Sequence, residues 1–364
     1  MKNVFILVLL LVALVGASFV FVFYGPTGSS NKDVKSMVDA VTSNTQKKYI
    51  ELVDPSGFVN TDDKPIKIAD YIGKKVIMLD VMTYSCINCQ RTFPYAVAWY
   101  DKYKDDGLII IGIHTPEFAF EKDKTNVEAA MKKFGITFPV VLDNDYGTWN
   151  AYGNRYWPRK YLIDINGNVV YDHIGEGGYE ETEMKIKELL AERAKVLGEQ
   201  SGVATDTSLA ASSIKETTVS AQSPETYIGS DRNVYLANGN GGVEGQQTLM
   251  LPKQLSQNKL YLGGTWDFMP EYATAGKDAV ISYAYNAQDV YLVMGADQST
   301  DMEVWQDGQL ISTSAAGEDV TSSGIVTVKD SRLYKLIHNE TPGAHTLELR
   351  IKGSGLRAFA FTFG

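Results

Sequence analysis

The chain has 364 residues, of which 44% are hydrophobic, and its formal net charge is −10. This length and composition allow about two domains with buried cores. The negative charge argues against nucleic acid as a partner, because binding to a phosphate backbone needs an excess of lysine and arginine.

Residues 4–24 form an apolar, uncharged segment that follows Lys2. About 20 helical residues extend roughly 30 Å, which is the thickness of the hydrocarbon core of a bilayer. We therefore expect a single N-terminal transmembrane helix within residues 1–24 that anchors the protein in the cell membrane. A cleaved signal peptide is the alternative, since the small residues 15–18 resemble a cleavage site. Both readings place the rest of the chain on the extracytoplasmic side.

Two segments that are rich in small and polar residues divide the remainder of the chain. Residues 25–47 and 199–223 contain many Ser, Thr, Asn or Ala residues and no aromatic ones. Such composition is typical of a spacer and a linker. We expect two globular domains between and after them, at residues 48–198 and 224–364.

The first domain alternates strand and helix patterns. Short apolar runs predict strands, and apolar residues with a period of 3.6 predict helices. The expected elements, in chain order, are a strand at 76–81, a helix after Cys86, a strand at 108–113, a helix from Thr125 to Phe134, a strand at 139–142, a hairpin of strands at 160–164 and 168–174, and a helix that begins near Glu180 and ends before Gly198. The order β-α-β-α-β-β-α predicts an α/β fold.

The only two cysteines of the chain, Cys86 and Cys89, lie between the first of these strands and the helix that follows. The N-terminus of a helix favours a thiolate, which is the nucleophilic form of cysteine. We expect Cys86 to attack a disulfide. Cys89, one helical turn further on, is then placed to resolve the mixed disulfide.

Two other uses of a cysteine pair are less consistent with this sequence. A structural zinc site needs four ligands, but there is no second cysteine pair and the four histidines are scattered. We therefore expect no metal and no cofactor. A purely structural disulfide would close such a small loop that it would remove little entropy from the unfolded chain.

Asp80 lies six residues before Cys86, inside the predicted strand. Burial would raise the pKa of this carboxyl, and the group can then relay a proton to or from Cys89. An aspartate at a strand end that binds nearby backbone amides is the alternative, and spacing alone does not separate the two.

Residues 80–94, with the acid, the cysteine pair and Pro94, resemble the active-site strand and helix of thioredoxins. Four motifs, TYSCINC (83–89), GIHTPEF (112–118), LDNDY (142–146) and YGNRYWP (152–158), resemble the redoxin domain of DipZ-type proteins in the TlpA branch. The resemblance implies a thioredoxin-like fold and thiol:disulfide oxidoreductase activity for the first domain.

The same resemblance implies further site residues and partners. Pro158 matches the cis-proline beside which a substrate docks, with an ordinary trans proline as the alternative. Trp157, Glu117 and His114 are then wall residues, the first two in contact with substrate. The implied partners are client proteins with thiols or disulfides. Because DipZ-type proteins carry a multi-span electron-delivering domain and this chain has at most one span, its electrons would come from a membrane electron-transfer partner or from small thiols.

The second domain has only strand patterns. Segments 279–285, 290–294, 302–306 and 345–351 alternate or run apolar between turn residues, which predicts an all-β sandwich. The sequence also resembles the C-terminal module of DipZ-type proteins, which is carbohydrate-binding-like. The candidates for a glycan contact are Trp266, in the turn-like segment 263–268, and Trp305, followed by Tyr261 and Tyr235. Core packing is the alternative for each of these rings.

These observations together predict an extracytoplasmic, membrane-tethered thiol:disulfide oxidoreductase. The alternative is a surface protein that binds glycans or proteins and in which the first domain is a redox-inert spacer. The presence of Cys86 and Cys89 together with Asp80 and Pro158 favours the enzyme, because an inert spacer needs none of them.

Overall fold

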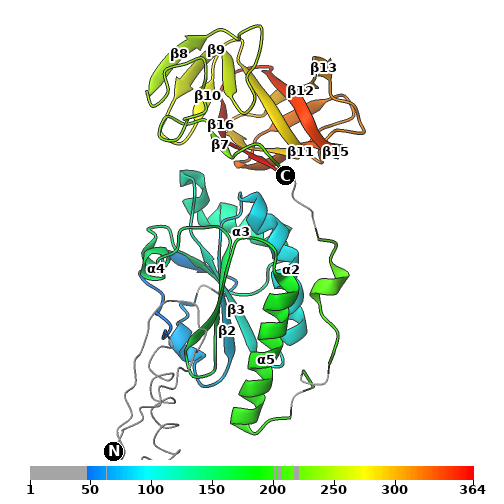
Figure 1. Ribbon diagram of the computed structural model, residues 1–364. Coiled ribbons are helices and arrows are strands. Elements are labelled where there is room, and N and C mark those ends of the chain that lie inside the picture. The colour runs from blue at the N-terminus through cyan, green and yellow to red at the C-terminus, as the bar shows by residue number, and fades with distance from the viewer. Residues whose placement is uncertain (1–46, 63, 201, 204–205, 217–220) are drawn as a thin grey trace, which may run out of the picture. The chain divides into compact units, whose positions relative to one another are not determined.

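The computed structural model describes residues 47–364 except 63, 201, 204–205 and 217–220 (Figure 1). Lys47–Gly364 form one compact unit. The expected transmembrane helix lies outside the described residues, as does nearly all of the expected spacer. Among the residues that are described, no helix is both long and apolar enough to cross a bilayer.

The first domain has the predicted order of elements. Its elements are β1 (Gly57–Val59), β2 (Val76–Met82), α2 (Ile87–Tyr103), β3 (Leu108–His114), α3 (Lys124–Lys133), β4 (Val140–Leu142), α4 (Gly147–Ala151), β5 (Arg159–Ile163), β6 (Val169–Ile174) and α5 (Tyr179–Leu197), with short 3₁₀ helices η1 (Ile68–Asp70) and η2 (Ala119–Lys122). The prediction missed β1, α4 and the two 3₁₀ helices, which are too short to show a hydrophobic period.

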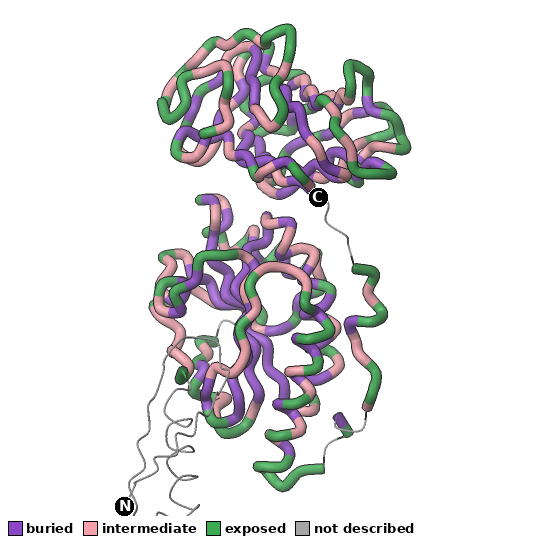
Figure 2. The backbone as a smooth tube through the Cα atoms, in the orientation of Figure 1, coloured by how far each residue is buried: buried purple, intermediate pink, exposed green. Residues whose placement is uncertain are grey.

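These strands form one mixed sheet in the order β1-β4-β3-β2-β5-β6. β2, β3 and β4 are parallel, whereas β5 and β6 are antiparallel to their neighbours. Every residue of β2 and β3 is buried, and these strands form the central buried layer in Figure 2. Strands covered on both faces read as continuous apolar runs, which is why they were recognisable in the sequence.

The two faces of the sheet have separate cores. Met78 and Met82 of β2 pack with residues of α2, α3 and α5, whereas Ile77, Leu79 and Val81 pack on the other face with residues of and beside α4. Because side chains alternate along a strand, Asp80 faces the same side as Met78 and Met82. The fold therefore directs Asp80 toward the helix that carries the cysteines.

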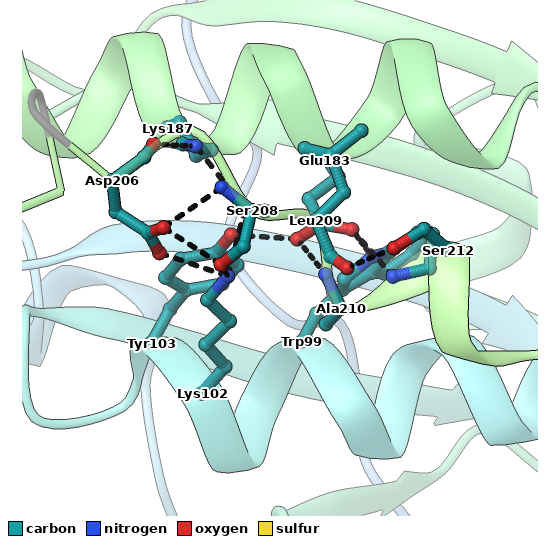
Figure 3. Close-up of polar contacts among 11 residues, drawn as sticks. Trp99, Lys102, Tyr103, Glu183, Lys187, Asp206, Ser208, Leu209, Ala210 and Ser212 are labelled. Carbon is teal, nitrogen blue, oxygen red and sulfur yellow. Dashed lines mark hydrogen bonds and ion pairs between the residues drawn. The ribbon is translucent and has the colours of Figure 1, made fainter.

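The described part of the expected linker lies against the first domain rather than apart from it. Glu183 of α5 accepts hydrogen bonds from the backbone N–H groups of Ala210 (2.6 Å) and Ala211 (2.8 Å). Lys102 of α2 pairs with Asp206 at 2.9 Å. Figure 3 shows the segment running between α5 and α2 along these contacts. Its composition led us to expect a linker and did not indicate this docking.

The second domain is all-β, as expected, but its strands are not divided between two separate sheets. Its strands are β7 (Thr226–Tyr227), β8 (Gly245–Leu249), β9 (Leu260–Phe268), β10 (Ala273–Ala275), β11 (Val280–Ala296), β12 (Thr300–Gln306), β13 (Gln309–Leu310), β14 (Ile325–Val328), β15 (Arg332–Ile351) and β16 (Leu356–Phe363). They are hydrogen-bonded into one antiparallel ten-stranded sheet. Within it, β11, β16, β10 and β9 close into a ring, because β9 pairs with both β10 and β11.

The long strand β11 explains why the second domain has one continuous sheet instead of the two sheets of the expected sandwich. Its first part pairs with β9 and its second part with β16, and the register shifts between Ala287 and Asp289. A bulge of this kind bends a strand and lets it pass from one layer to another. The two strands expected at 279–285 and 290–294 are therefore halves of one bent strand.

Candidate active site

Cys86 and Cys89 occupy the positions that the sequence predicted. Cys86 is the residue immediately before the first turn of α2, in an extended conformation, and its carbonyl accepts a hydrogen bond from the N–H of Gln90 at 3.0 Å. Cys86 is half-buried, Cys89 is fully buried, and neither forms a disulfide. Only Cys86 is therefore accessible to another molecule.

The surroundings of Cys89 keep its sulfur protonated. Burial raises the pKa of the Cys89 thiol well above its usual value, and a hydrogen bond to Cys86 adds to the shift. A buried thiol becomes a nucleophile only when a nearby base accepts its proton. The site therefore needs such a base.

Asp80 has the properties that such a base needs. It is 1% exposed, and neither carboxylate oxygen accepts a hydrogen bond from any described residue. The alternative in which Asp80 binds backbone amides is therefore wrong for this structure. Burial raises the pKa of the Asp80 carboxyl, and the positive charge of Lys160 opposes that shift.

Pro158 lies at the same end of the sheet as the cysteines. The Trp157–Pro158 peptide bond is cis, as the resemblance implied. Pro158 directly precedes β5, which pairs antiparallel to β2 with Arg159 opposite Val81. Because β2 leads into the loop before Cys86, the start of β5 adjoins that loop.

The expected wall residues differ in what they offer a substrate. Trp157 is half-buried and donates its indole N–H to the carbonyl of Thr115 at 3.1 Å. Its ring packs against Trp149 at a tilt of 39°, with ring centroids 4.3 Å apart. His114 is fully buried and stacks on Tyr84, and burial lowers its pKa to about 3. His114 is therefore neutral and is not available for proton exchange near neutral pH.

The carboxylate of Glu117 is already occupied within the chain. It accepts hydrogen bonds from the hydroxyl of Tyr227 (2.8 Å) and from Arg232 (2.9 Å). Burial raises the pKa of the Glu117 carboxyl, while the charge of Arg232 acts in the opposite direction. In this arrangement a substrate would reach Glu117 only in competition with these two groups.

Glu121 was not singled out from the sequence but holds the two loops of the site together. It is fully buried and accepts hydrogen bonds from the Thr83 hydroxyl (2.5 Å) and from the backbone N–H groups of Ser85 (3.2 Å), Glu117 (2.6 Å) and Phe118 (3.0 Å). Thr83 and Ser85 lead directly to Cys86. The local sequence does not reveal the contacts of Glu121 with Thr83 and Ser85, because these residues lie more than 35 positions earlier in the chain.

Lys160 was also missed, although the sequence contained a signal. It lies in a strand of otherwise mostly apolar residues, and it is 0% exposed. β5 places it directly opposite Asp80 of β2. A lysine at an inward position of a predicted strand is an informative exception, since lysine is almost never fully buried without a partner.

The candidate glycan residues are not brought together on an open face. Trp266 is 0% exposed and donates its indole N–H to the carbonyl of Gly263 at 2.9 Å, so the expectation of an exposed ring in a turn is wrong. It lies in β9, where Gly264 approaches Asp278 too closely to carry a side chain. Trp305 is half-buried, and the guanidinium of Arg350 lies 3.8 Å from its ring centroid. Tyr261 is also buried.

Two family models match parts of this chain, and several known proteins are similar to it. Residues 30–190 match the redoxin family, and residues 223–364 match the family described as thioredoxin like C-terminal domain. Protein DipZ of Mycobacterium tuberculosis is 37% identical over 311 residues, which cover 85% of this chain and 42% of DipZ. Thiol-disulfide oxidoreductase ResA of Geobacillus kaustophilus is 37% identical over 114 residues, 31% of this chain and 62% of ResA. The crystal structure of a thiol:disulfide interchange protein of the thioredoxin family from Chlorobium tepidum overlaps 40% of this chain and 97% of its own, at 23% identity and a TM-score of 0.34.

The fold, the cysteine pair and the family matches indicate that the first domain is a thioredoxin-like redoxin domain. More narrowly, the chain is similar to DipZ through both of its domains. The chain spans less than half the length of the DipZ proteins that it matches.

Proposed function

We propose that the protein is a thiol:disulfide oxidoreductase that exchanges disulfides with client proteins through Cys86 and Cys89. The observation that carries this proposal is the contrast between the two thiols. Cys86 is half-exposed at the start of α2, whereas Cys89 is buried one helical turn further on. A pair in which one sulfur meets the client and the other is sheltered is suited to sequential attack and resolution.

The reaction in the reducing direction has two steps. The Cys86 thiolate attacks one sulfur of a client disulfide, and the client's other sulfur leaves as a thiolate. Cys89 then gives up its proton, and its sulfur attacks the sulfur of Cys86. The bond between Cys86 and the client breaks, the client receives that electron pair, and a Cys86–Cys89 disulfide remains. The cysteine pair has lost two electrons and the client disulfide has gained two.

Pro158 directly precedes β5, whose first residue lies opposite Val81 of β2, and a substrate strand would dock beside the nearby cysteine loop. Trp157 supplies a half-buried ring at the same place. We assign both residues to client binding. Asp80 is assigned to the proton transfer of Cys89, because it is buried on the α2 side of the sheet and its oxygens have no described hydrogen-bond donor.

We further propose that residues 1–24 anchor the protein in the membrane, with both domains on the extracytoplasmic side. The support is the uncharged segment 4–24 after Lys2. Electrons would reach the cysteine pair from a membrane electron-transfer partner or from small thiols. Protease added to intact spheroplasts should remove the domains, and recovery of the full chain in the cytosolic fraction would contradict this location.

The activity is tested with the purified chain in detergent. We expect it to catalyse the reduction of insulin disulfides by dithiothreitol, and Cys86→Ser to abolish that catalysis. A wild-type protein without catalysis would refute the proposed function. Equilibration with glutathione buffers gives the reduction potential, where a value near roughly −270 mV indicates a reductase and one near roughly −120 mV an oxidant.

A further inference from the structure

Lys160 places a second charged side chain in the interior beside Cys89. It lies directly opposite Asp80 in the β2–β5 ladder, and Lys160, Asp80 and Cys89 are 0%, 1% and 0% exposed. The Lys160 amine lies 5.9 Å from the centre of the Tyr179 ring at the start of α5. Its side chain therefore enters the same face of the sheet as Asp80, the face that α2 and α5 cover.

Both charged groups are poorly satisfied by hydrogen bonds. Among the described residues, the amine of Lys160 reaches only the carbonyl of Gly175, at the long distance of 3.5 Å, and the Asp80 carboxylate accepts none. Burying one such group without partners is costly, and burying two opposite ones side by side is tolerable mainly because each compensates the charge of the other. Such pairs are concentrated at functional sites.

The other titratable groups packed around the pair form a path to the surface. They are Cys86, Cys89 and Arg91 of α2, Tyr179 of α5, His173 of β6 opposite Lys160, and Glu176 in the turn after β6. Glu176 follows Gly175 and pairs with Arg91 at 3.2 Å. Arg91, Glu176 and Tyr179 line a pocket of about 310 Å³. The charged series thus runs from Cys89 through Asp80 and Lys160 to this pocket.

We propose that Lys160 is a positioning residue for the resolving step and that it acts through Asp80. This inference rests on the proposed exchange activity. The ammonium group of Lys160 stabilises the ionised Asp80 carboxylate, which is the form that can accept a proton. When Cys89 attacks the sulfur of Cys86, its proton goes to Asp80, the client leaves as a thiolate, and the Cys86–Cys89 disulfide forms. Asp80 afterwards returns that proton to water.

The charges determine how the removal of Lys160 changes the pH dependence of the resolving step. Removing a positive charge within a few ångströms of a carboxylate raises the carboxyl pKa by about one to three units. Asp80 would then be protonated over a wider pH range, and fewer molecules would contain a base at a given pH. This shift moves the resolving step to higher pH and leaves the first attack by Cys86 unchanged.

Single-turnover reaction with an aromatic disulfide that releases a coloured thiol separates the two steps. The first equivalent of coloured thiol reports attack by Cys86, and the second reports resolution by Cys89. For Lys160→Met we expect a normal first phase. The second phase should be about tenfold slower at pH 7, with its pH midpoint raised by at least about one unit. Lys132→Met, at an exposed lysine of α3, is the matched control and should show wild-type behaviour in both phases.

The double variant Asp80→Asn, Lys160→Met tests whether Lys160 acts through Asp80. Once Asp80 cannot ionise, replacing Lys160 should slow the second phase no further. An unchanged pH profile in Lys160→Met, or an equal slowing in the Asp80→Asn background, would overturn the inference. Circular dichroism checks that the variant folds, and Lys160→Gln takes its place if it does not. A wild-type protein that lacks the first phase would instead refute the exchange activity itself.

Discussion

Glu183 of α5 and Tyr103 of α2 are joined by a hydrogen bond of 2.6 Å from the Tyr103 hydroxyl to the Glu183 carboxylate. The same carboxylate also accepts the indole N–H of Trp99 at 3.1 Å and the backbone N–H groups of Ala210 and Ala211 (Figure 3). Glu183 has no exposed surface. One carboxylate therefore ties together two helices and the segment that follows them.

Replacing Glu183 should loosen both the helix pair and the docked segment. In Glu183→Gln an NH₂ group replaces one carboxylate oxygen. This group donates hydrogen bonds and cannot accept them, so buried N–H or O–H groups that bonded to that oxygen lose their partner. We expect a loss of about 2–4 kcal/mol in the free energy of unfolding. Urea unfolding measures it, and trypsin cleavage after Lys215 should become faster.

Glu188→Gln is the matched control for this prediction, because Glu188 is an exposed residue of the same helix paired only with Lys185 among the ion pairs described. It should change the free energy of unfolding by less than about 0.5 kcal/mol. Equal losses in the free energy of unfolding would contradict the prediction, because the buried hydrogen bonds of Glu183 would then stabilise the fold no more than the exposed ion pair of Glu188.

The second prediction concerns the roles of the two cysteines. Cys89→Ala should accumulate mixed disulfides between Cys86 and client proteins, because the attacking thiol is retained and the resolving thiol is absent. Cys86→Ser should form none. Iodoacetamide should alkylate Cys86 of the reduced protein well before Cys89, since Cys89 is buried and burial raises its thiol pKa. Faster alkylation of Cys89, read by mass spectrometry, would reverse the assignment.

A third prediction follows from His114. Its folded pKa is lowered by burial to about 3, below the value of about 6.5 in an unfolded chain. Between these values the unfolded state binds a proton that the folded state excludes. His114 therefore causes no loss of stability above pH 6.5, and an increasing one as the pH falls toward 3. The slope is about 1.4 kcal/mol per pH unit.

The buried carboxyls act in the opposite sense, which decides how His114 must be measured. Burial raises the pKa values of Asp80, Glu117 and Glu121, so these groups favour the folded state more as the pH falls. The comparison of His114→Phe with wild type cancels their contribution. We expect the variant to gain about 2–3 kcal/mol relative to wild type between pH 6.5 and pH 4.5 in urea unfolding. Parallel pH profiles would show that His114 is not kept neutral.

The sequence predicted those parts of the site that depend on local order. Cys86 lies before a helix because an apolar strand precedes it and a helix-forming segment follows. The cis bond at Pro158 was implied only by the family resemblance. Residues whose role depends on distant partners were not predictable in this way. Glu183 lies near the start of α5, but its donors come from α2 and the linker.

Trp266 shows the same limit in the second domain. Two successive glycines, Gly263 and Gly264, are typical of a turn. In the structure Gly264 has a φ of +77° inside a strand, and a Cβ there would lie 2.2 Å from the carbonyl oxygen of Asp278. The glycine is needed for close approach to a neighbouring segment that the local sequence does not reveal.

The last prediction separates a core role from a glycan-binding role for the two tryptophans. Trp266 is fully buried among the residues of the domain core, so Trp266→Ala should lower the free energy of unfolding by about 3–5 kcal/mol. Trp305 is half-buried and stacks on Arg350, so its replacement should cost much less. Both variants are made in the full chain and titrated with cell-wall and plant-type oligosaccharides while tryptophan fluorescence is followed. If the domain binds a sugar by stacking, Trp305→Ala should weaken that response at unchanged stability. The opposite result would be a Trp266→Ala protein that keeps wild-type stability but loses the fluorescence response to sugar that the wild type shows. That result would identify Trp266 as the ligand contact.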